Sequence, residues 1–242
     1  STPLYSSAAS DVYKRQGLGA LTAVLMLIFK DTILSFVSSI QINSNDLFKI
    51  GDWVEAPHFG ADGDVIDIAL HTIKIQNWDK TISIIPTHKL IDSSFKNWRG
   101  MTESKGRRIK RALRIRMSSI RHLNKTDIDV LLKVVLIKDY IAAKNKDINA
   151  YNSDNNIDKS VLINGRNLTN IGVFRKYIES YVETHSAINK DLMIMARQLE
   201  PDEYGLPIEI YAFSNDKRWQ NYEYIIADIF DHITAAAATT TA

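Results

Sequence analysis

The side chains that most often carry catalysis are few in this chain, and they lack catalytic spacing. There are six histidines and no cysteine. The histidines are His58, His71, His88, His122, His185 and His232. No HExxH helix, glycine-rich phosphate loop or GxSxG turn occurs, and without cysteine there is no disulfide, thiolate metal site or thiol nucleophile. The sequence therefore predicts a protein that is not an enzyme and uses no metal or cofactor.

One acidic segment faintly resembles a calcium-binding loop. Asp62, Asp64 and Asp67 lie close together around Gly63. Their spacing differs from the alternating ligand pattern of a calcium loop, which also needs a bidentate acid at its end. A tight turn at Asp62-Gly63 between two strands explains the same residues, so no calcium site is expected.

A basic segment is the strongest charge feature. Between positions 96 and 125 there are eleven Lys or Arg residues and one acid, Glu103. Such a stripe can attract nucleic acid, acidic lipid or permeating ions. Alternation of apolar and basic residues over 109–117 also fits a half-exposed strand, and no aromatic residue lies between Arg99 and Lys125 to stack on bases. We expect an exposed strand whose field biases anions, with Arg107, Lys110, Arg114 and Arg116 as its main charges.

Residues 17–42 form the most apolar segment, and Lys30-Asp31 divides it. Residues 17–29 carry no charge, but thirteen residues are fewer than the roughly 20 that span a bilayer as a helix. Residues 32–42 alternate apolar and polar positions, as in an amphipathic helix. We predict two helices with a bend at Lys30 and Asp31, where Asp31 caps the second helix and Leu34 and Phe36 dock toward the next domain. The alternative is a buried core helix of a soluble protein.

The rest of the chain divides into segments of different pattern. We expect residues 1–16 to be a disordered stretch or a cloning scar, and residues 235–242 to be a low-complexity tail. Residues 47–104 show strand periodicity and turn residues typical of a small β-domain of about five strands. Residues 105–234 predict an α+β domain with a helix from 125 to 144 and a loop insertion near 145–170.

Ordered sequence strings resemble the small-conductance mechanosensitive channel (MscS) family. The strings are GDWVE, GDVIDI, TIKIQNWDK, IIPTHKLI and FKNW. Longer strings are similar to the miniconductance branch of that family, namely NWDKTISIIP, SFKNWRG, GRRIKRAL, NLTNIGVFRKYIE and RQLEPDEYGLPIEIYAFS. The likeness covers residues 17–233, nearly all of the chain between its two ends.

The resemblance implies a fold, a location and a function. The fold is an α+β membrane-protein fragment with a pore-lining helix, a small Sm-like β-barrel domain and an α+β sandwich domain. The expected assembly is a homoheptamer in the bacterial inner membrane, with its soluble domains in the cytoplasm around a vestibule. It would release ions and small solutes on hypo-osmotic shock and contact membrane lipid, with no nucleic acid as partner. Upstream membrane helices and the final strand of the family are expected to be missing here.

The resemblance also implies roles for pore residues. Leu27 aligns with one sealing leucine of the family, and Ala23 stands where the other would be. Gly19 and Ala20, with Ala23, would let neighbouring helices pack closely. Two other functions stay open: a soluble Sm-like RNA-binding protein, and a membrane scaffold that does not conduct.

Overall fold

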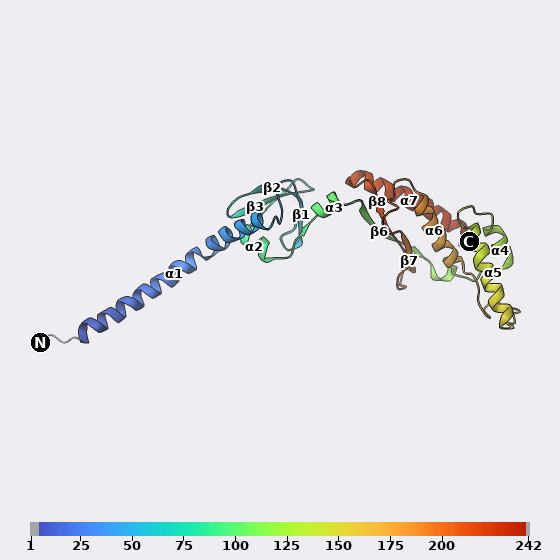
Figure 1. Cartoon of the computed structure of the whole chain (residues 1–242), viewed down its shortest axis with the longest axis horizontal. Coiled ribbons are helices and arrows are strands. Elements are labelled where there is room, and N and C mark those ends of the chain that lie inside the picture. Colours follow the sequence, from blue (N-terminus) through green and yellow to red (C-terminus); the bar gives the residue numbers. More distant parts are fainter. Residues whose placement is uncertain (1–4, 241–242) are drawn as a thin grey trace. The chain divides into compact units, whose positions relative to one another are not determined.

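The computed structural model describes residues 5–240, and side-chain burial for residues 8–238 (Figure 1). The chain forms two compact units, Ser1–Gly100 and Met101–Ala242. The ends of the predicted N-terminal scar and C-terminal tail, residues 1–4 and 241–242, lie outside the described residues.

The first unit begins with one long helix, α1 (Tyr5–Ser44), of 40 residues. It continues through Lys30 and Asp31, so the predicted division into two helices does not appear. Neither residue is a helix breaker, and no glycine or proline lies between Gly19 and Gly51 to interrupt the hydrogen bonds. Residues 5–16, expected to be disordered, also belong to α1. Their Ala, Lys, Arg and Gln content favours a helix once a neighbouring turn has formed.

After α1 the chain forms a five-stranded antiparallel sheet with strand order β4-β3-β2-β1-β5. The elements are β1 (Trp53–Ala56), η1 (Pro57–Phe59), β2 (Ala61–Ile68), β3 (Thr72–Asn77), β4 (Ile82–Pro86), α2 (Thr87–Asp92) and β5 (Lys96–Asn97). Alternate apolar side chains from the strands form a core that also includes Ile42 and Phe48. The five predicted strands are present, and the short helix α2 was not predicted.

Gly63 lies inside β2, where the sequence predicted a turn. Gly63 pairs with Asn77 of β3, and a β-carbon at position 63 would lie 1.9 Å from the backbone oxygen of Gln76. The glycine is therefore required by a close approach of two strands. The turn that connects β3 to β4 lies at Asp79-Lys80, with Lys80 at a φ of 72°.

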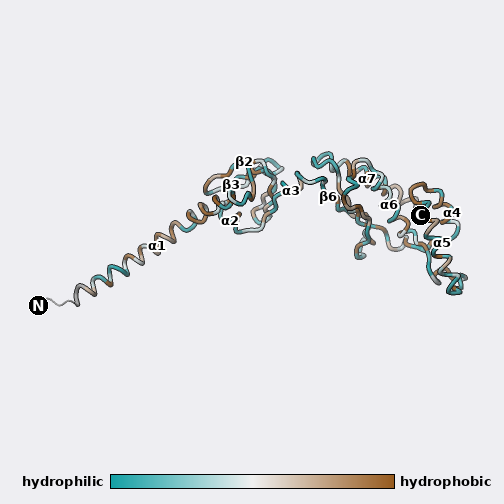
Figure 2. Tube along the Cα trace, in the orientation of Figure 1, coloured by the Kyte–Doolittle hydropathy of each residue, from teal (hydrophilic) through white to brown (hydrophobic). Residues whose placement is uncertain are grey.

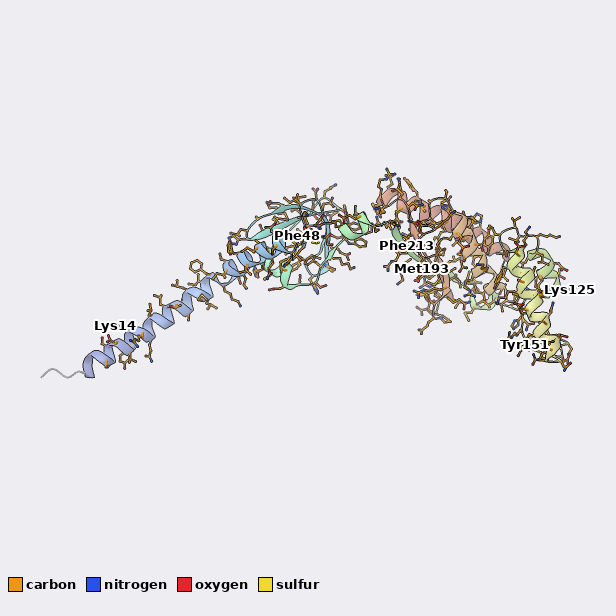
Figure 3. All side chains as sticks on the ribbon, viewed as in Figure 1. Lys14, Phe48, Lys125, Tyr151, Met193 and Phe213 are labelled. Carbon is orange, nitrogen blue, oxygen red and sulfur yellow. The ribbon has the colours of Figure 1, made fainter. Side chains whose placement is uncertain are left out.

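The second unit contains a three-stranded antiparallel sheet of order β6-β8-β7 and several helices. Its elements, starting at the boundary, are α3 (Arg99–Glu103), β6 (Arg107–Ile115), η2 (Met117–Ser119), α4 (Lys125–Leu131), α5 (Lys138–Asp154), α6 (Asn170–Thr184), β7 (Met195–Gln198), β8 (Leu206–Ser214) and α7 (Trp219–Thr240). One face of the sheet packs on α6 and α7 through buried Ile, Phe and Ala side chains (Figures 1 and 3).

Three predicted boundaries in this unit are wrong. The helix expected at 125–144 is two helices, because α4 ends in the turn before Ile137. Residues 145–154, expected as the first part of the loop, belong to α5, and the loop runs from 155 to 169. Residues 235–240, expected as a tail, extend α7, and Ala237 is buried. Alanine is the best helix former, and a run of alanines after Ile233 continues the helix.

Candidate functional site

Helix α1 exposes large apolar side chains on all of its sides. The exposed fractions of these side chains between Leu18 and Ile40 lie between 38% and 75%. The residues are Leu18, Leu21, Val24, Leu25, Met26, Leu27, Ile28, Phe29, Ile33, Leu34, Phe36, Val37 and Ile40. Apolar positions recur along the helix in Figure 2. Ala8–Ser44 has the length and composition of a membrane span, and only 6% of its most apolar window is buried, unlike a core helix.

The end of α1 turns its polar side chains toward the protein. Ser35 and Ser38 are 3% and 6% exposed, whereas Phe36, between them in sequence, is 53% exposed. Ser39 Oγ donates a hydrogen bond to the carbonyl of Leu70 at 3.1 Å. This arrangement is the reverse of an amphipathic helix on a soluble domain, which buries its apolar face. The expectation that Phe36 and Leu34 dock toward the β-domain is therefore wrong, since Leu34 is also exposed.

Asp31, Ser35 and His88 have the residue types of a hydrolytic triad. Ser35 Oγ lies 3.0 Å from His88 Nδ1, and His88 Nε2 lies 3.9 Å from Asp31 Oδ1. Ser35 is buried between α1 and α2, so a substrate carbonyl has no access to its hydroxyl. The arrangement instead joins α1 to α2, and we call these three residues the latch.

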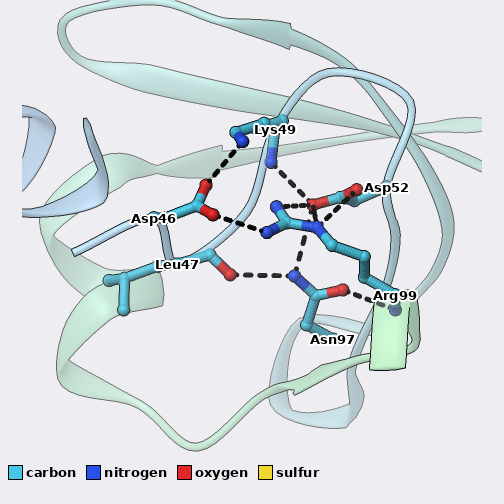
Figure 4. A network of polar contacts seen from close by, with 6 residues as sticks. All are labelled: Asp46, Leu47, Lys49, Asp52, Asn97 and Arg99. Carbon is cyan, nitrogen blue, oxygen red and sulfur yellow. Dashed lines mark hydrogen bonds and ion pairs between the residues drawn. The ribbon is translucent and has the colours of Figure 1, made fainter. Parts of the chain in front are cut away.

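A second polar group lies where α1 ends and the β-domain begins (Figure 4). Arg99 contacts both oxygens of Asp52, with its Nε at 3.1 and 3.0 Å from them, and its Nη2 forms a further short contact with Oδ2. Arg99 Nη1 also lies 2.9 Å from Asp46 Oδ2. The fork of a guanidinium matches this two-carboxylate geometry, which a lysine could not reproduce. We call Asp46, Asp52, Asn97 and Arg99 the clamp.

Asn97 completes the clamp. Its Nδ2 donates to the carbonyl of Leu47 at 2.8 Å and to Asp52 Oδ2 at 3.2 Å, and its Oδ1 accepts from the backbone N–H of Arg99 at 2.8 Å. The turn itself needs unusual backbone angles, with φ of 49° at Asp46 and 92° at Gly51. The clamp therefore fixes the connection after α1 against both β1 and β5.

The clamp shifts the titration of its acidic members. Burial tends to raise the pKa of Asp52, but hydrogen bonds from Arg99, from the Lys49 backbone and from Asn97 outweigh it and lower that pKa. The hydrogen bond from Lys49 is the main cause that lowers the pKa of Asp46. The same contacts raise the pKa of Arg99, mainly through its hydrogen bonds to Asp52. The clamp is therefore fully ionised at neutral pH.

The sequence did not identify the latch or the clamp. Each group joins two segments about fifty positions apart in the chain, and every member except Asp31, which was predicted to cap a helix, was an ordinary polar residue in its own segment. One signal for the clamp was available in the sequence. Asp52 lies in the string GDWVE and Asn97 lies in the string FKNW, and both strings carried the resemblance. Neither string indicated that the two residues meet.

The four predicted vestibule cations do not share one environment. Arg107 lies on the helix-covered face of the sheet, donates to the carbonyl of Lys217 at 3.2 Å and sits 4.3 Å above the Tyr222 ring. Arg114 forms an ion pair with Asp202 at 2.9 Å. Lys110 and Arg116 are exposed, and within residues 5–240 neither has an ion-pair partner within 4 Å.

Lys110 and Arg114, two of the other predicted cations, lie on the opposite face of the sheet from Arg107. Lys110 and Arg114 stand opposite Tyr211 and Pro207 of β8, on the face away from α7. The structure adds Arg108 to this face, 5.9 Å from the centre of the Tyr211 ring. Arg116 follows the strand and is exposed.

The predicted pore residues Leu27, Ala23, Gly19 and Ala20 are all exposed on α1, and Leu27 is 75% exposed. No group of three or more His, Asp or Glu side chains among the described residues could hold a metal ion. The described part of the chain thus presents an outward-facing apolar helix joined to a β-domain by the latch and the clamp.

Comparison with known proteins agrees with this arrangement. Residues 31–100 match the family model of the mechanosensitive ion channel β-domain. The small-conductance mechanosensitive channel MscMJ of Methanocaldococcus jannaschii is 36% identical over 81 residues, which are 34% of this chain and 23% of that protein. An uncharacterised MscS family protein of Helicobacter pylori is 27% identical over 103 residues, 43% of this chain and 16% of that protein.

Solved structures share the fold over a longer stretch. The closed-state crystal structure of Helicobacter pylori MscS has a TM-score of 0.59 at 15% identity and covers 92% of this chain and 67% of that one. Arabidopsis thaliana MSL1 has a TM-score of 0.58 at 11% identity, over 93% of this chain and 62% of that one. In sequence the chain is therefore similar to the β-domain of mechanosensitive channels, and in fold it is similar to the Helicobacter pylori MscS structure. The predicted order of apolar helix, β-rich domain and α+β domain is confirmed. The segments that match in sequence span a quarter or less of the length of the curated relatives.

Proposed function

We propose that this chain forms part of a subunit of a tension-gated ion channel that releases ions and small solutes on hypo-osmotic shock. One observation carries the proposal: α1 exposes its apolar side chains on every side between Leu18 and Phe29, while its last turns bury Ser35 and Ser38. Exposed apolar area in water costs about 25 cal/mol per Å², so such a helix is stable only in lipid or against other apolar helices.

The gate is assigned to the apolar half of α1. A ring of Leu27 side chains from several subunits forms a constriction that excludes water and therefore ions. Ala23, Gly19 and Ala20 allow neighbouring helices to approach and slide. Membrane tension favours the state with the larger area in the membrane plane, so outward tilting of these helices widens and wets the constriction.

The latch and the clamp restrict where α1 can tilt. The end of α1 is fixed to the β-domain, so tilting must be accommodated further along the helix. Lys30 lies directly before the anchored turns and Asp31 is their first residue, and we assign the bend to these two residues in one of the channel's states. Asp31 contacts His88 of α2, so bending there also changes the latch.

Assembly and location follow from the same proposal. The subunit forms a homo-oligomer, a heptamer as in the miniconductance branch, in the bacterial inner membrane with its two soluble domains in the cytoplasm. Lipid contacts α1. The basic residues Lys110 and Arg116 bias the vestibule toward anions, whereas Arg107 packs on Tyr222 of α7 and Arg114 is paired with Asp202, so both contribute less.

Patch-clamp recording in giant spheroplasts that lack their own mechanosensitive channels tests the proposal. Suction should open channels, and the cells should survive osmotic downshock better than cells with an empty vector. A stable membrane oligomer without tension-gated current would instead support a non-conducting scaffold. A protein that stays in solution without detergent and binds RNA would support the Sm-like alternative, which the exposed apolar helix disfavours.

A further inference from the structure

Two adjoining depressions lie between helices α5 and α6. One has a volume of about 390 Å³ and the other of about 360 Å³, and Tyr140 and Lys144 of α5 line both of them. We call the pair the α5–α6 site. The charged residues that line it are Lys144, Asp147, Arg166, Arg175, Lys176 and Glu179. Four cations against two acids give a concave surface that attracts anions.

The acids of the site do not neutralise its cations. Glu179 is paired with Lys176 at 2.7 Å, which leaves three cations against one acid. Lys144 and Arg175 are exposed, and neither has an ion-pair partner within 4 Å in the part of the chain that the structure describes. Such cations are ordinary on a convex surface, whereas these line one concave surface, where a bound anion can contact more than one of them.

Arg166 is held in place without the use of its side-chain N–H groups. Its guanidinium lies 3.8 Å from the centre of the ring of Tyr151, near the end of α5 (Figure 3). The buried amide of Asn152 accepts from the backbone N–H of Arg166 at 2.8 Å and donates to its carbonyl at 2.9 Å. Stacking contacts the flat face of the guanidinium and leaves its N–H edges available. Arg166 is therefore fixed in position with donors that suit the oxygens of a phosphate.

The start of α6 also lines the larger depression, but its first turn is already capped. Thr169 Oγ1 accepts a hydrogen bond from the backbone N–H of Gly172 at 3.1 Å. This contact satisfies one of the free N–H groups at the helix start. An anion in the depression is therefore bound by the side-chain cations.

The remaining lining of the larger depression defines the ligand further. Tyr140, Ile148 and Leu168 supply apolar contacts, and Asp147 supplies a carboxylate. A carboxylate accepts hydrogen bonds from hydroxyl groups and repels a second anion. The ligand therefore carries one anionic group for the cations and hydroxyl groups for Asp147.

We propose that the α5–α6 site binds a sugar phosphate or the sugar-phosphate part of a nucleotide. The phosphate lies between Lys144 and Arg166, where the guanidinium fork matches two phosphate oxygens, and Arg175 adds attraction from the smaller depression. Asp147 accepts hydrogen bonds from the sugar hydroxyls. This binding goes beyond the proposed channel function, because none of these residues belongs to α1 or to the cations assigned to the vestibule.

Isothermal titration calorimetry on the full chain in detergent tests the site. Ribose 5-phosphate is the probe, and ribose and inorganic phosphate each lack one of its two recognised groups. We expect ribose 5-phosphate to bind with a dissociation constant in the micromolar to millimolar range, inorganic phosphate to bind at least about tenfold more weakly, and ribose not to bind. No saturable heat from ribose 5-phosphate, or an equal affinity for inorganic phosphate, would overturn the proposal.

Adenosine 5′-monophosphate distinguishes the two sources of the ligand. Tighter binding than that of ribose 5-phosphate would identify a nucleotide, with its base against the ring of Tyr140. Equal or weaker binding would identify a free sugar phosphate. Either result supports the site, since both probes carry the phosphate and the hydroxyl groups.

Two substitutions locate the phosphate. Lys144→Gln and Arg166→Gln should each weaken the binding of ribose 5-phosphate by about tenfold or more, because each removes a charged hydrogen-bond donor. Lys110→Gln is the matched control, because Lys110 is another exposed cation of this unit and lies on β6, outside the site. Circular dichroism confirms that each variant is folded. An equal loss with Lys110→Gln would show attraction by net charge alone and would overturn the proposal.

Asp147→Ala tests the contact with the sugar. The affinity for ribose 5-phosphate should fall while that for inorganic phosphate does not, so the preference between them should approach one. An unchanged preference would overturn the assignment of a sugar phosphate. The titration is separate from patch-clamp recording: absence of binding would leave the channel function standing, and absence of tension-gated current would leave the α5–α6 site standing.

Discussion

The two halves of α1 belong to one helix but have opposite relations to the rest of the chain. Residues 17–29 expose their apolar side chains and have no packing partner among the described residues. Residues 31–44 bury Ser35, Ser38 and Ile42 and are joined to the β-domain by the latch. The free energy that holds α1 against the β-domain is therefore concentrated in its last four turns, about 14 residues, and a force on the first half must pass through them.

The largest effect on stability is expected at Ile42, the apolar residue by which the second half of α1 packs into the core of the β-domain. Ile42 is 1% exposed and belongs to the same core as Phe48, so Ile42→Ala should lower the free energy of unfolding of the first unit by about 2–5 kcal/mol. Tryptophan fluorescence during denaturant unfolding in detergent measures this change. Ile40→Ala is the control, because Ile40 is 52% exposed, and an equal loss there would contradict the comparison.

The next effect is expected at the clamp. Asp52→Asn removes the charge that Arg99 and Asn97 bind, at a cost of about 2 kcal/mol for a hydrogen-bonded charge. Because the folded-state pKa of Asp52 is lowered, its contribution is present above the ordinary aspartate pKa of 3.8 and is lost as the pH falls through the lower folded value. Unfolding free energy between pH 3 and pH 7 should decrease less steeply toward acid in Asp52→Asn. Identical pH profiles for both proteins would refute this role.

A smaller effect is expected at the latch. Ser35→Ala removes the hydrogen bond to His88 and should lower the free energy of unfolding by about 1 kcal/mol. Ser38→Ala makes the same change in volume at a similarly buried position on the same helix and should cost less. If the two substitutions prove equal, the latch contributes nothing beyond packing.

The smallest effect on folding is expected in the unpartnered half. Leu27 is 75% exposed, so Leu27→Ser should change the free energy of unfolding by less than about 0.5 kcal/mol. Its effect on gating should be large, because a hydroxyl wets the constriction and lowers the tension needed to open it. Patch-clamp thresholds and growth after induction give the measurement. An unchanged threshold would remove Leu27 from the gate.

Sequence patterns predicted the strands well, and the reason is local. Alternation of apolar residues, as in Ile73 and Ile75, marks a buried face directly. The helix boundaries were missed where local preference was weak, at Lys30-Asp31 and between α4 and α5. The alanine run after Ile233 was read by its low complexity instead of its helix propensity.

The site was less predictable than the fold, because its contacts join distant positions. Arg99 meets Asp52 across 47 positions, and Ser35 meets His88 across 53. The alternation in residues 32–42 was recognised, but Phe36 was predicted to point inward, whereas Ser35 and Ser38 are buried there and Ile42 is the apolar residue that enters the core. Periodicity gives the two faces of a helix, and only the surrounding solvent decides which face is buried.

The close approach of β2 and β3 at Gly63 has a genetic consequence. Any side chain at this position must push the two central strands of the β-domain apart, since its β-carbon would lie 1.9 Å from a backbone oxygen. A screen for cells that fail to survive osmotic downshock would therefore recover substitutions of Gly63, which lies outside the apolar half of α1. Such alleles would be recessive losses of folded protein, whereas substitutions at Leu27 would be gain-of-function alleles that leak at rest.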